Sequence, residues 1–143
     1  MSEEALSATS DSKMITEVSS FQLETVSEFH AHIAAILNLS PDHLDRHKSF
    51  ENYKAIKARI SLNQDENDYL VYNADDAETQ SCIEEIVRKR EPGKAPSLVP
   101  FSLSRALPFE ISEIEPPGKH NLENALAAAA ICSCAGKIGR AHV

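Results

Sequence analysis

HIAAILNL, residues 32–39, and DYLVYN, residues 68–73, are the two stretches that decide which fold this sequence predicts. Their central letters, AAIL and YLVY, are apolar at consecutive positions, a pattern typical of strands buried between two layers of helices. Helical periodicity follows in SFENYKAIKARI, in AETQSCIEEIVRKR and, near the end, in HNLENALAAAAICSCA. Strands and helices thus alternate, and we expect an α/β fold with a mostly parallel sheet flanked by helices.

Two further apolar runs predict strands on either side of this pattern. KMITEV (residues 13–18) precedes the first strand, and SLVPFSL (residues 97–103) follows the second helical segment. The latter lies within residues 91–118, which contain most of the seven prolines of the chain. Because proline lacks a backbone donor, we expect loop, an edge strand or short antiparallel additions there.

Length and charge limit the possible functions. The chain has 143 residues and a formal net charge of −8, with 22 acidic and 14 basic side chains. This length fits one domain and is small for a complete enzyme with several substrates. The acidic balance leaves no basic stripe for a phosphate backbone, so we expect no nucleic-acid partner. Without a long apolar run or signal-peptide pattern, we expect a cytoplasmic protein with no membrane partner.

The three cysteines indicate a reducing environment. Cys132 and Cys134 lie in an alanine-rich helical pattern, which favours buried thiols over a disulfide or a zinc site. We therefore expect buried, reduced cysteines.

The two ends of the chain differ from the rest. Residues 1–13 are polar and unperiodic, so we expect a frayed start or the stump of a longer chain, and their sequence indicates no function. Residues 138–143, IGRAHV, interrupt the last helical pattern, and the codons ATC GGA AGA GCA CAC GTC that would encode them match a sequencing adapter read in frame. We expect residues 14–137 to form the domain and residues 138–143 to be an artefactual tail.

Polar side chains follow three of the predicted strands. They are Glu17, Ser19 and Ser20 after the first, Asn38, Ser40, Asp42 and His43 after the second, and Asn73, Asp75 and Asp76 after the third. The carboxyl ends of parallel strands meet at one edge, where ligands bind, so we expect these groups to gather there. Each segment alone is also an ordinary turn or helix-cap sequence.

A lysine lies in the apolar stripe of the helix expected after Ser49. The stripe consists of Phe50, Tyr53, Ile56 and Ile60. Lys54 and Arg59 are expected to point away from it, whereas Lys57, four residues after Tyr53, falls inside it. A buried ammonium is costly unless it is paired. Lys57 therefore either extends its amine to water or reaches the polar edge of the sheet.

Two other pairs of polar side chains are candidate ligands. His30 and His32 form a His-x-His pair, but no third and fourth metal ligand is evident nearby, so we expect them at the entry of the strand. Asn121 and Asn124 lie three residues apart on one face of the last helix. Two amides there suit a nucleotide base or phosphate, although Asn121 alone is also a good N-cap.

Five blocks of the sequence resemble, in order, the central ATP-binding domain of the Mur ligases, which add amino acids to the peptidoglycan precursor. The blocks are EVSSFQLE (17–24), ILNLSPDHLDRH (36–47), YKAIK (53–57), NADD (73–76) and GKHNLENALAA (118–128). The resemblance covers about residues 14–137 and implies a Rossmann-like sheet. SSFQLE is similar to the members that join D-glutamate to UDP-N-acetylmuramoyl-L-alanine.

The resemblance implies an ATP-dependent ligase, monomeric and bacterial. ATP would phosphorylate the carboxylate of UDP-N-acetylmuramoyl-L-alanine, and the amine of D-glutamate would attack the acyl phosphate, releasing ADP and phosphate. Mg²⁺ would bridge the phosphates and screen their charge. By position, Glu17, His43 and Lys57 would be the Mg²⁺ ligands. Lys57 would be the carbamylated lysine of the family, in which carbon dioxide has converted the amine into a carboxylate.

The resemblance also implies roles for other side chains. Asn121 and Asn124 would contact ATP. Ser19 would bind the cofactor, and Asp42 and Tyr53 would line the reaction centre together with the metal ligands.

The sequence departs from the family in one respect that bears on activity. It contains no Gly-Lys-Thr or Gly-Lys-Ser phosphate loop, which in the family lies upstream of EVSSFQLE. The domains that hold the UDP sugar and help hold D-glutamate do not match either. We therefore expect an internal fragment that carries half a nucleotide site and is inactive alone.

Two alternatives remain open. The first is a non-catalytic module that binds a nucleotide or a partner, against which the joint presence of Glu17, His43 and Lys57 argues. The second is a sibling amide ligase, such as the diaminopimelate-adding or folate-polyglutamating enzymes, which share the HNxxN helix. The SSFQLE block disfavours these siblings.

Overall fold

The centre of the molecule is a parallel sheet of three strands in the order β1-β2-β3. The computed structural model describes Thr9 and residues 12–41, 44–105 and 118–136. The strands are β1 (Ile33–Ile36), β2 (Tyr69–Asn73) and β3 (Ser97–Phe101). Tyr69 of β2 lies opposite Ile33 of β1 and opposite Ser97 of β3. The predicted α/β fold with a parallel sheet is confirmed.

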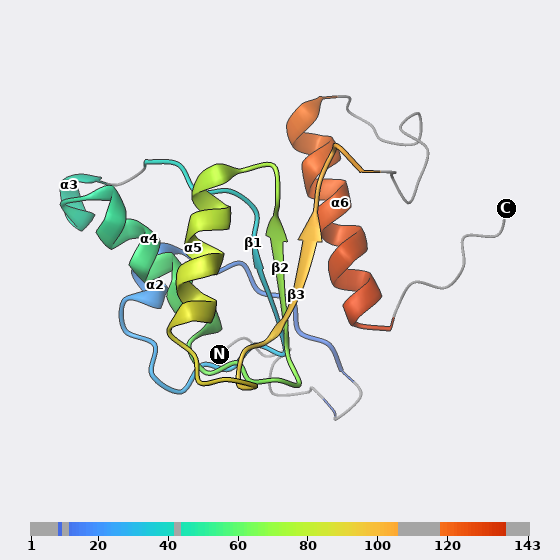
Figure 1. Cartoon of the computed structure of the whole chain (residues 1–143), viewed down its shortest axis with the longest axis horizontal. Coiled ribbons are helices and arrows are strands. Elements are labelled where there is room, and N and C mark those ends of the chain that lie inside the picture. Colours follow the sequence, from blue (N-terminus) through green and yellow to red (C-terminus); the bar gives the residue numbers. More distant parts are fainter. Residues whose placement is uncertain (1–8, 10–11, 42–43, 106–117, 137–143) are drawn as a thin grey trace, which may run out of the picture.

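Helices cover both faces of this sheet. They are α2 (Ser20–Leu23), α3 (Leu44–His47), α4 (Phe50–Ala58) with the 3₁₀ turn η1 (Arg59–Ser61), α5 (Ala77–Arg88) and α6 (Lys119–Cys134). Figure 1 shows α4 and α5 on one side of the sheet and α6 on the other. None of the helices in the described ranges is long and apolar enough to cross a membrane.

The continuous apolar letters of β1 and β2 reflect burial on both faces. Successive strand residues point to opposite sides. Ala34, Ile36 and Leu70 accordingly pack in the core under α4 and α5, whereas Val71 packs with Leu126 of α6. Leu70 and Val71 are both 0% exposed. The prediction that these strands lie between two helix layers is confirmed.

Helices α4 and α6 begin in different ways. The Ser49 hydroxyl accepts a hydrogen bond from the Asn52 amide at 3.2 Å, as expected for the start of α4. Helix α6 instead begins after Gly118, whose φ of 144° is readily adopted only by glycine, and no side chain caps it. Asn121 is inside the helix, so the alternative that it serves as the N-cap is wrong.

The strand predicted over residues 13–18 is absent. These residues are irregular, and Met14 and Ile15 are 67% and 94% exposed. A strand must pair its backbone groups with a neighbour, and within the described residues nothing pairs with this segment. The adjacent apolar side chains of Met14 and Ile15 are therefore not sufficient to define a strand.

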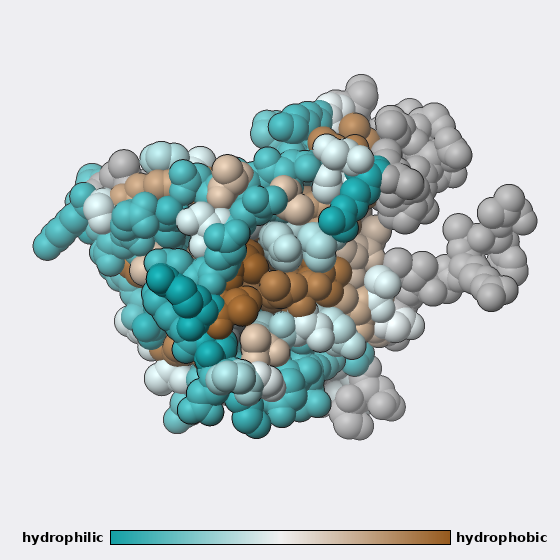
Figure 2. Space-filling view, in the orientation of Figure 1, coloured by the Kyte–Doolittle hydropathy of each residue, from teal (hydrophilic) through white to brown (hydrophobic). Residues whose placement is uncertain are grey.

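The proline-rich segment supplies an edge strand, which was one of the expected options. β3 pairs with β2 in parallel, so this strand is not an antiparallel addition, and residues 106–117 of the segment lie outside the described residues. A pocket of about 500 Å³ beside β3 is lined by Tyr72, Gln80, Ile83, Glu84, Val87, Arg88 and Leu98. Figure 2 shows apolar residues near the middle of this face, between α5 and β3. The edge strand is thus incompletely covered on the α5 side.

Lys54 and Arg59, which were expected to point away from the apolar stripe, are held by contacts on the flanks of α4. The Lys54 side chain is 12% exposed, and its amine lies 2.9 Å from a carboxylate oxygen of Glu51 and 2.9 Å from one of Glu78. Arg59 donates to the carbonyls of Leu23 and Val26, at 2.8 and 2.5 Å. The reason is that α5 and the chain after α2 cover the flanks of α4, which the pattern of one helix cannot reveal.

All three cysteines are free thiols, as predicted, but their burial differs. Cys82 is buried, Cys134 is half-buried and Cys132 is exposed. Helix α6 packs on the sheet through Leu126, Ala127, Ala130, Ile131 and Cys134. Cys132 lies off this stripe, so the prediction that it is buried is wrong.

Candidate functional site

A pocket of about 330 Å³ lies between the segment 17–22 and helix α4. It is lined by Glu17, Val18, Ser19, Ser20, Phe21, Gln22, Tyr53 and Lys57. Four of the predicted site residues are therefore brought together: Glu17 and Ser19 on one wall, Tyr53 and Lys57 on the other. Glu17 reaches the pocket on an irregular segment, and not at a strand end as predicted, because residues 13–18 form no strand.

Glu17 and Lys57 supply the charged groups of this pocket. Glu17 is exposed and Lys57 is half-buried. The Lys57 amine lies 5.9 Å from the centre of the Tyr53 ring, within the range of a cation–π contact. Neither side chain forms an ion pair with the other or with any further residue that the structure describes. Glu17 and Lys57 thus line one pocket without pairing with each other.

Ser19 fixes the turn that follows Glu17. Its amide donates to the Gln22 side-chain oxygen at 2.9 Å, and its hydroxyl accepts from the Gln22 amide at 3.3 Å. This is a capping box, and it gives α2 a defined start although the helix has one turn. The S-x-x-Q spacing at residues 19–22 is the sequence signal of this motif. The Ser19 hydroxyl lines the pocket while taking part in the cap.

His47 contributes to the site without having been predicted. It is 1% exposed, and its Nε2 atom lies 3.1 Å from the Ser20 hydroxyl. Its ring stacks with Phe21 at a centroid distance of 5.7 Å and contacts Tyr53 at 5.5 Å. The only hint in the sequence is its place at the end of the ILNLSPDHLDRH block.

The carboxylates after β2 lie at the carboxyl edge of the sheet, as predicted, but they serve local structure. Asp76 caps α5 by accepting from the Thr79 amide at 2.9 Å, and it also accepts from the Leu39 amide after β1 at 3.2 Å. Asp75 accepts from the Ser102 hydroxyl after β3 at 2.6 Å. The ends of the three strands are therefore tied together by two aspartates.

The start of α6 lies close to this edge. The hydrogen bond from Ser102 holds the pKa of the Asp75 carboxyl below its usual value, against the effect of burial, and the Leu103 amide and the positive charge of Lys119 act in the same direction. Asn121 is half-buried and Asn124 is exposed on the same helix. Neither lines the pocket that holds Glu17 and Lys57. A single ligand would have to reach around the sheet to contact both the pair Glu17 and Lys57 and the two asparagines of α6.

Comparison with known proteins decides the family. The family model for the Mur ligase middle domain matches residues 4–132. The chain belongs to the Mur ligase family. The resemblance stated from the five sequence blocks is confirmed, and the parallel sheet agrees with it.

Several curated proteins are similar to this Mur ligase chain. It is 42% identical, over 92% of its length, to the UDP-N-acetylmuramoylalanine–D-glutamate ligase of Caldanaerobacter subterraneus subsp. tengcongensis, of which it covers 31%. Proteins of the same name from Solibacter usitatus and Oceanobacillus iheyensis are 42% and 40% identical over 91% and 94% of the chain. The chain thus spans about a third of the length of the curated relatives it matches.

The Mur ligase pocket fits the predicted magnesium site in part. Glu17 and Lys57 line it together, whereas Asp42 and His43 lie outside the described residues, so their predicted roles stay predictions. No group of three or more His, Cys, Asp or Glu side chains within the described ranges could hold a metal. A lysine carbamate supplies carboxylate oxygens, which hard cations such as Mg²⁺ prefer.

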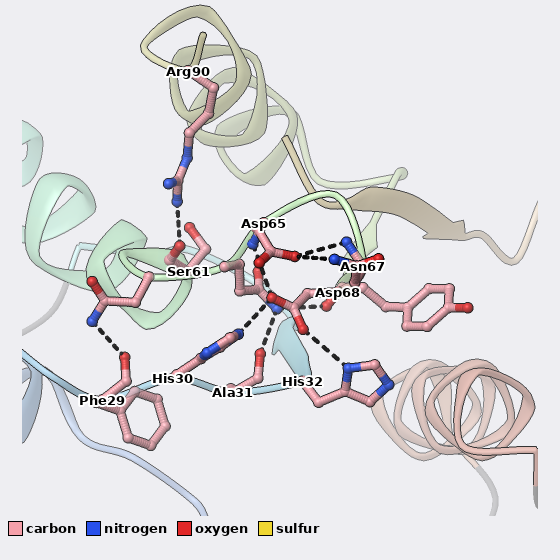
Figure 3. A network of polar contacts seen from close by, with 12 residues as sticks. Phe29, His30, Ala31, His32, Ser61, Asp65, Asn67, Asp68 and Arg90 are labelled. Atoms are coloured by element: carbon pink, nitrogen blue, oxygen red, sulfur yellow. Dashed lines mark hydrogen bonds and ion pairs between the residues drawn. The ribbon is translucent and has the colours of Figure 1, made fainter. Parts of the chain in front are cut away.

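His30 and His32 lie at the entry of β1, as expected, and share one carboxylate (Figure 3). His30 Nε2 is 2.6 Å and His32 Nδ1 is 3.0 Å from the oxygens of Asp68, whose side chain is 4% exposed. The Asp65 amide donates to the same carboxylate at 2.9 Å. This network joins the amino ends of β1 and β2, so both histidines have a structural role in this Mur ligase chain.

Proposed function

We propose that this chain is the central part of an ATP-dependent ligase that joins D-glutamate to UDP-N-acetylmuramoyl-L-alanine in the cytoplasm, during peptidoglycan synthesis. The observation that carries the proposal is the pocket in which Glu17, Ser19, Tyr53 and Lys57 meet, at the positions where the family resemblance places reaction-centre residues. The shared name of the relatives and the SSFQLE block support D-glutamate as the amino acid.

The reaction proceeds through an acyl phosphate. The carboxylate of UDP-N-acetylmuramoyl-L-alanine attacks the γ-phosphorus of ATP, the bond to the bridging oxygen breaks, and ADP leaves. The amine of D-glutamate then attacks the acyl carbon, loses a proton and displaces phosphate, forming the amide. These steps bring several anions together, so the site has to supply positive charge and fixed positions.

Glu17 and Lys57, with His43, would hold Mg²⁺, which when bound screens the charges of the phosphates. Lys57 can do this only after modification. Its neutral amine attacks carbon dioxide, a nitrogen–carbon bond forms and a proton is released, which leaves a carbamate with two oxygens. Lys57 has no ion-pair partner among the described residues that would hold it as an ammonium, which suits an amine that reacts in this way.

The remaining residues orient the nucleotide and the pocket. Asn121 and Asn124, on the first turns of α6, contact ATP away from the transferred phosphate. Ser19 fixes the segment that carries Glu17 through its cap with Gln22, and Tyr53 forms the wall behind the Lys57 amine.

An assay of the complete protein that contains this chain tests the proposal. Phosphate release and amide product are measured with UDP-N-acetylmuramoyl-L-alanine, ATP and Mg²⁺, and with D-glutamate, L-glutamate or diaminopimelate as the amine. Of the three amines, we expect only D-glutamate to give product. In Glu17→Gln we expect the rate of product formation to fall by about a hundredfold or more. Glu28→Gln, an exposed glutamate outside the pocket, is the matched control and should keep full activity.

Two results would contradict the proposal. Product with diaminopimelate alone would assign the chain to a sibling ligase. If no amine gives ATP-dependent product, the chain is not part of a ligase, and the non-catalytic module becomes the better description.

A further inference from the structure

A buried imidazole connects the two walls of the pocket. Ser20 and Phe21 belong to the wall formed by the segment 17–22, and Tyr53 belongs to the wall formed by α4. His47 contacts all three: Nε2 lies 3.1 Å from the Ser20 hydroxyl, and the ring packs against both aromatic rings. His47 does not line the pocket itself, so it acts on the pocket only through these neighbours.

The backbone of His47 is fixed independently of these contacts. Its carbonyl accepts from the Ser49 amide at 2.8 Å and from the Asn52 side chain at 2.9 Å. Between them, Lys48 has a φ of 66°, a conformation that turns the chain sharply from α3 into α4. The imidazole therefore projects from a turn that these backbone contacts fix.

Ring packing alone does not account for a histidine at this position. The Nδ1 atom is buried without a hydrogen bond, although it lies 3.4 Å from a carboxylate oxygen of Glu24. Glu24 is instead bonded to Arg46, at 2.8 and 3.3 Å. A phenylalanine would make the same ring contacts without burying an unbonded nitrogen. The imidazole adds the hydrogen bond to Ser20 and the longer contact with Glu24, and only Ser20 lines the pocket.

We propose that His47 is a positioning residue for the ligase reaction: it holds Ser20, and through it the segment 17–22, so that Glu17 faces Lys57 across the pocket. The capping box of Ser19 and Gln22 makes this segment stiff, so fixing Ser20 also fixes the chain that leads to Glu17. The effect of His47 on catalysis rests on the proposed function, whereas the contact by which His47 holds Ser20 does not.

The test uses the complete protein and two independent readouts. The first is amide hydrogen exchange, followed by mass spectrometry, in peptides that cover residues 17–24 and residues 69–73. In His47→Phe we expect exchange in residues 17–24 to rise by about tenfold or more, because the contact to Ser20 is lost, with no change in β2. His47→Gln retains an amide that can reach Ser20 and should restore most of the protection.

The second readout separates positioning from general loss of stability. We expect His47→Phe to lower kcat by about tenfold or more and to raise the Mg²⁺ concentration for half-maximal rate, with little change in the KM for ATP. Gln64→Leu is the matched control: Gln64 is 2% exposed, also has one unbonded buried atom and lies outside the pocket. It should leave kcat and the Mg²⁺ requirement unchanged.

Combining His47→Phe with Ser20→Ala shows whether His47 acts through Ser20. If it does, the double variant loses little more activity than the more impaired single variant. Unchanged exchange in residues 17–24 of His47→Phe, or an equal effect of Gln64→Leu on the Mg²⁺ requirement, would overturn the inference. An inactive wild-type protein would reject the proposed function, while the exchange rates would still decide whether His47 holds the segment.

Discussion

Glu17 and Lys57 face the same pocket from opposite walls and form no ion pair with each other or elsewhere in the described part of the chain. Acidic partners are not scarce, because Lys54, Lys94 and Lys119 all pair with glutamates. The separation of a carboxylate and an amine across a shared cavity fits a ligand that both sides hold, and it is the basis of the magnesium site proposed above.

Removing either asparagine of α6 should weaken ATP binding selectively. In the complete protein, we expect Asn121→Ala or Asn124→Ala to raise the KM for ATP by about tenfold, because a contact away from the reacting phosphate is equally present in ground and transition states. The KM for D-glutamate should hardly change. Ser133→Ala, on the exposed end of the same helix, is the control. A selective loss of D-glutamate binding would show that α6 serves another ligand.

Asp68 should stabilise the fold in a pH-dependent way. Burial raises the pKa of its carboxyl, but hydrogen bonds from the Asp65 amide and from His30 and His32 outweigh it, so the net pKa is below the ordinary value. A lowered folded-state pKa gives stability that is present above the unfolded pKa and is lost as the pH falls through the folded pKa. We expect Asp68→Asn to lower the free energy of unfolding by about 2 kcal/mol at pH 7.

Urea unfolding at several pH values measures this effect. The difference in the free energy of unfolding between wild type and Asp68→Asn should become smaller as the pH falls below the ordinary carboxyl range. The reason is that protonation of Asp68 removes the extra stability of the wild type. Glu91→Gln, which replaces an exposed carboxylate, should change stability little at any pH. A difference that is independent of pH would mean that packing, and not the charge of Asp68, joins the strand ends.

The cysteines should differ in their reactivity toward iodoacetamide near pH 8. Cys132 is exposed and should react first. Cys82 should stay unmodified until the protein unfolds, because burial shields it and raises its pKa to about 11. Burial also raises the pKa of Cys134, which should react more slowly than Cys132. Peptide mapping after timed labelling gives the order, and equal rates at Cys82 and Cys132 would contradict the packing of α5.

The sheet and its helices were predictable because burial on both faces leaves a direct mark on the sequence. The continuous apolar letters of β1 and β2, and the serine before α4, each reflect a local cause. The strand expected over residues 13–18 is absent because strand formation depends on a pairing neighbour, which a short apolar run does not specify.

The candidate site was predictable only where residue type limits the chemistry. Lys57 was conspicuous because an amine in an apolar stripe is costly, and the structure places it at a pocket with Glu17. His47 was not predictable, since its role depends on Ser20 and Phe21, more than twenty residues earlier in the chain. The partners of Lys54 and Arg59 were not predictable, because the pattern of one helix does not show which of its flanks its neighbours cover.

The role of Lys57 is tested most directly by the ligation rate of the complete protein with Lys57→Arg, measured with and without added bicarbonate. A guanidinium keeps the positive charge but cannot be carbamylated. We expect a loss of about a hundredfold or more, or about 3 kcal/mol of transition-state stabilisation, which bicarbonate does not restore. The wild type should lose activity when carbon dioxide and bicarbonate are removed, and regain it when bicarbonate is added.

Lys54→Arg serves as the matched control for this measurement. Lys54 lies one turn earlier on α4 and pairs with Glu51 and Glu78, so an arginine there should leave the rate nearly unchanged. If Lys57→Arg loses activity while Lys54→Arg does not, and only the wild type responds to bicarbonate, the carbamate assignment holds. Near-normal turnover in Lys57→Arg would contradict it, and would make Lys57 a plain cation at the edge of the pocket.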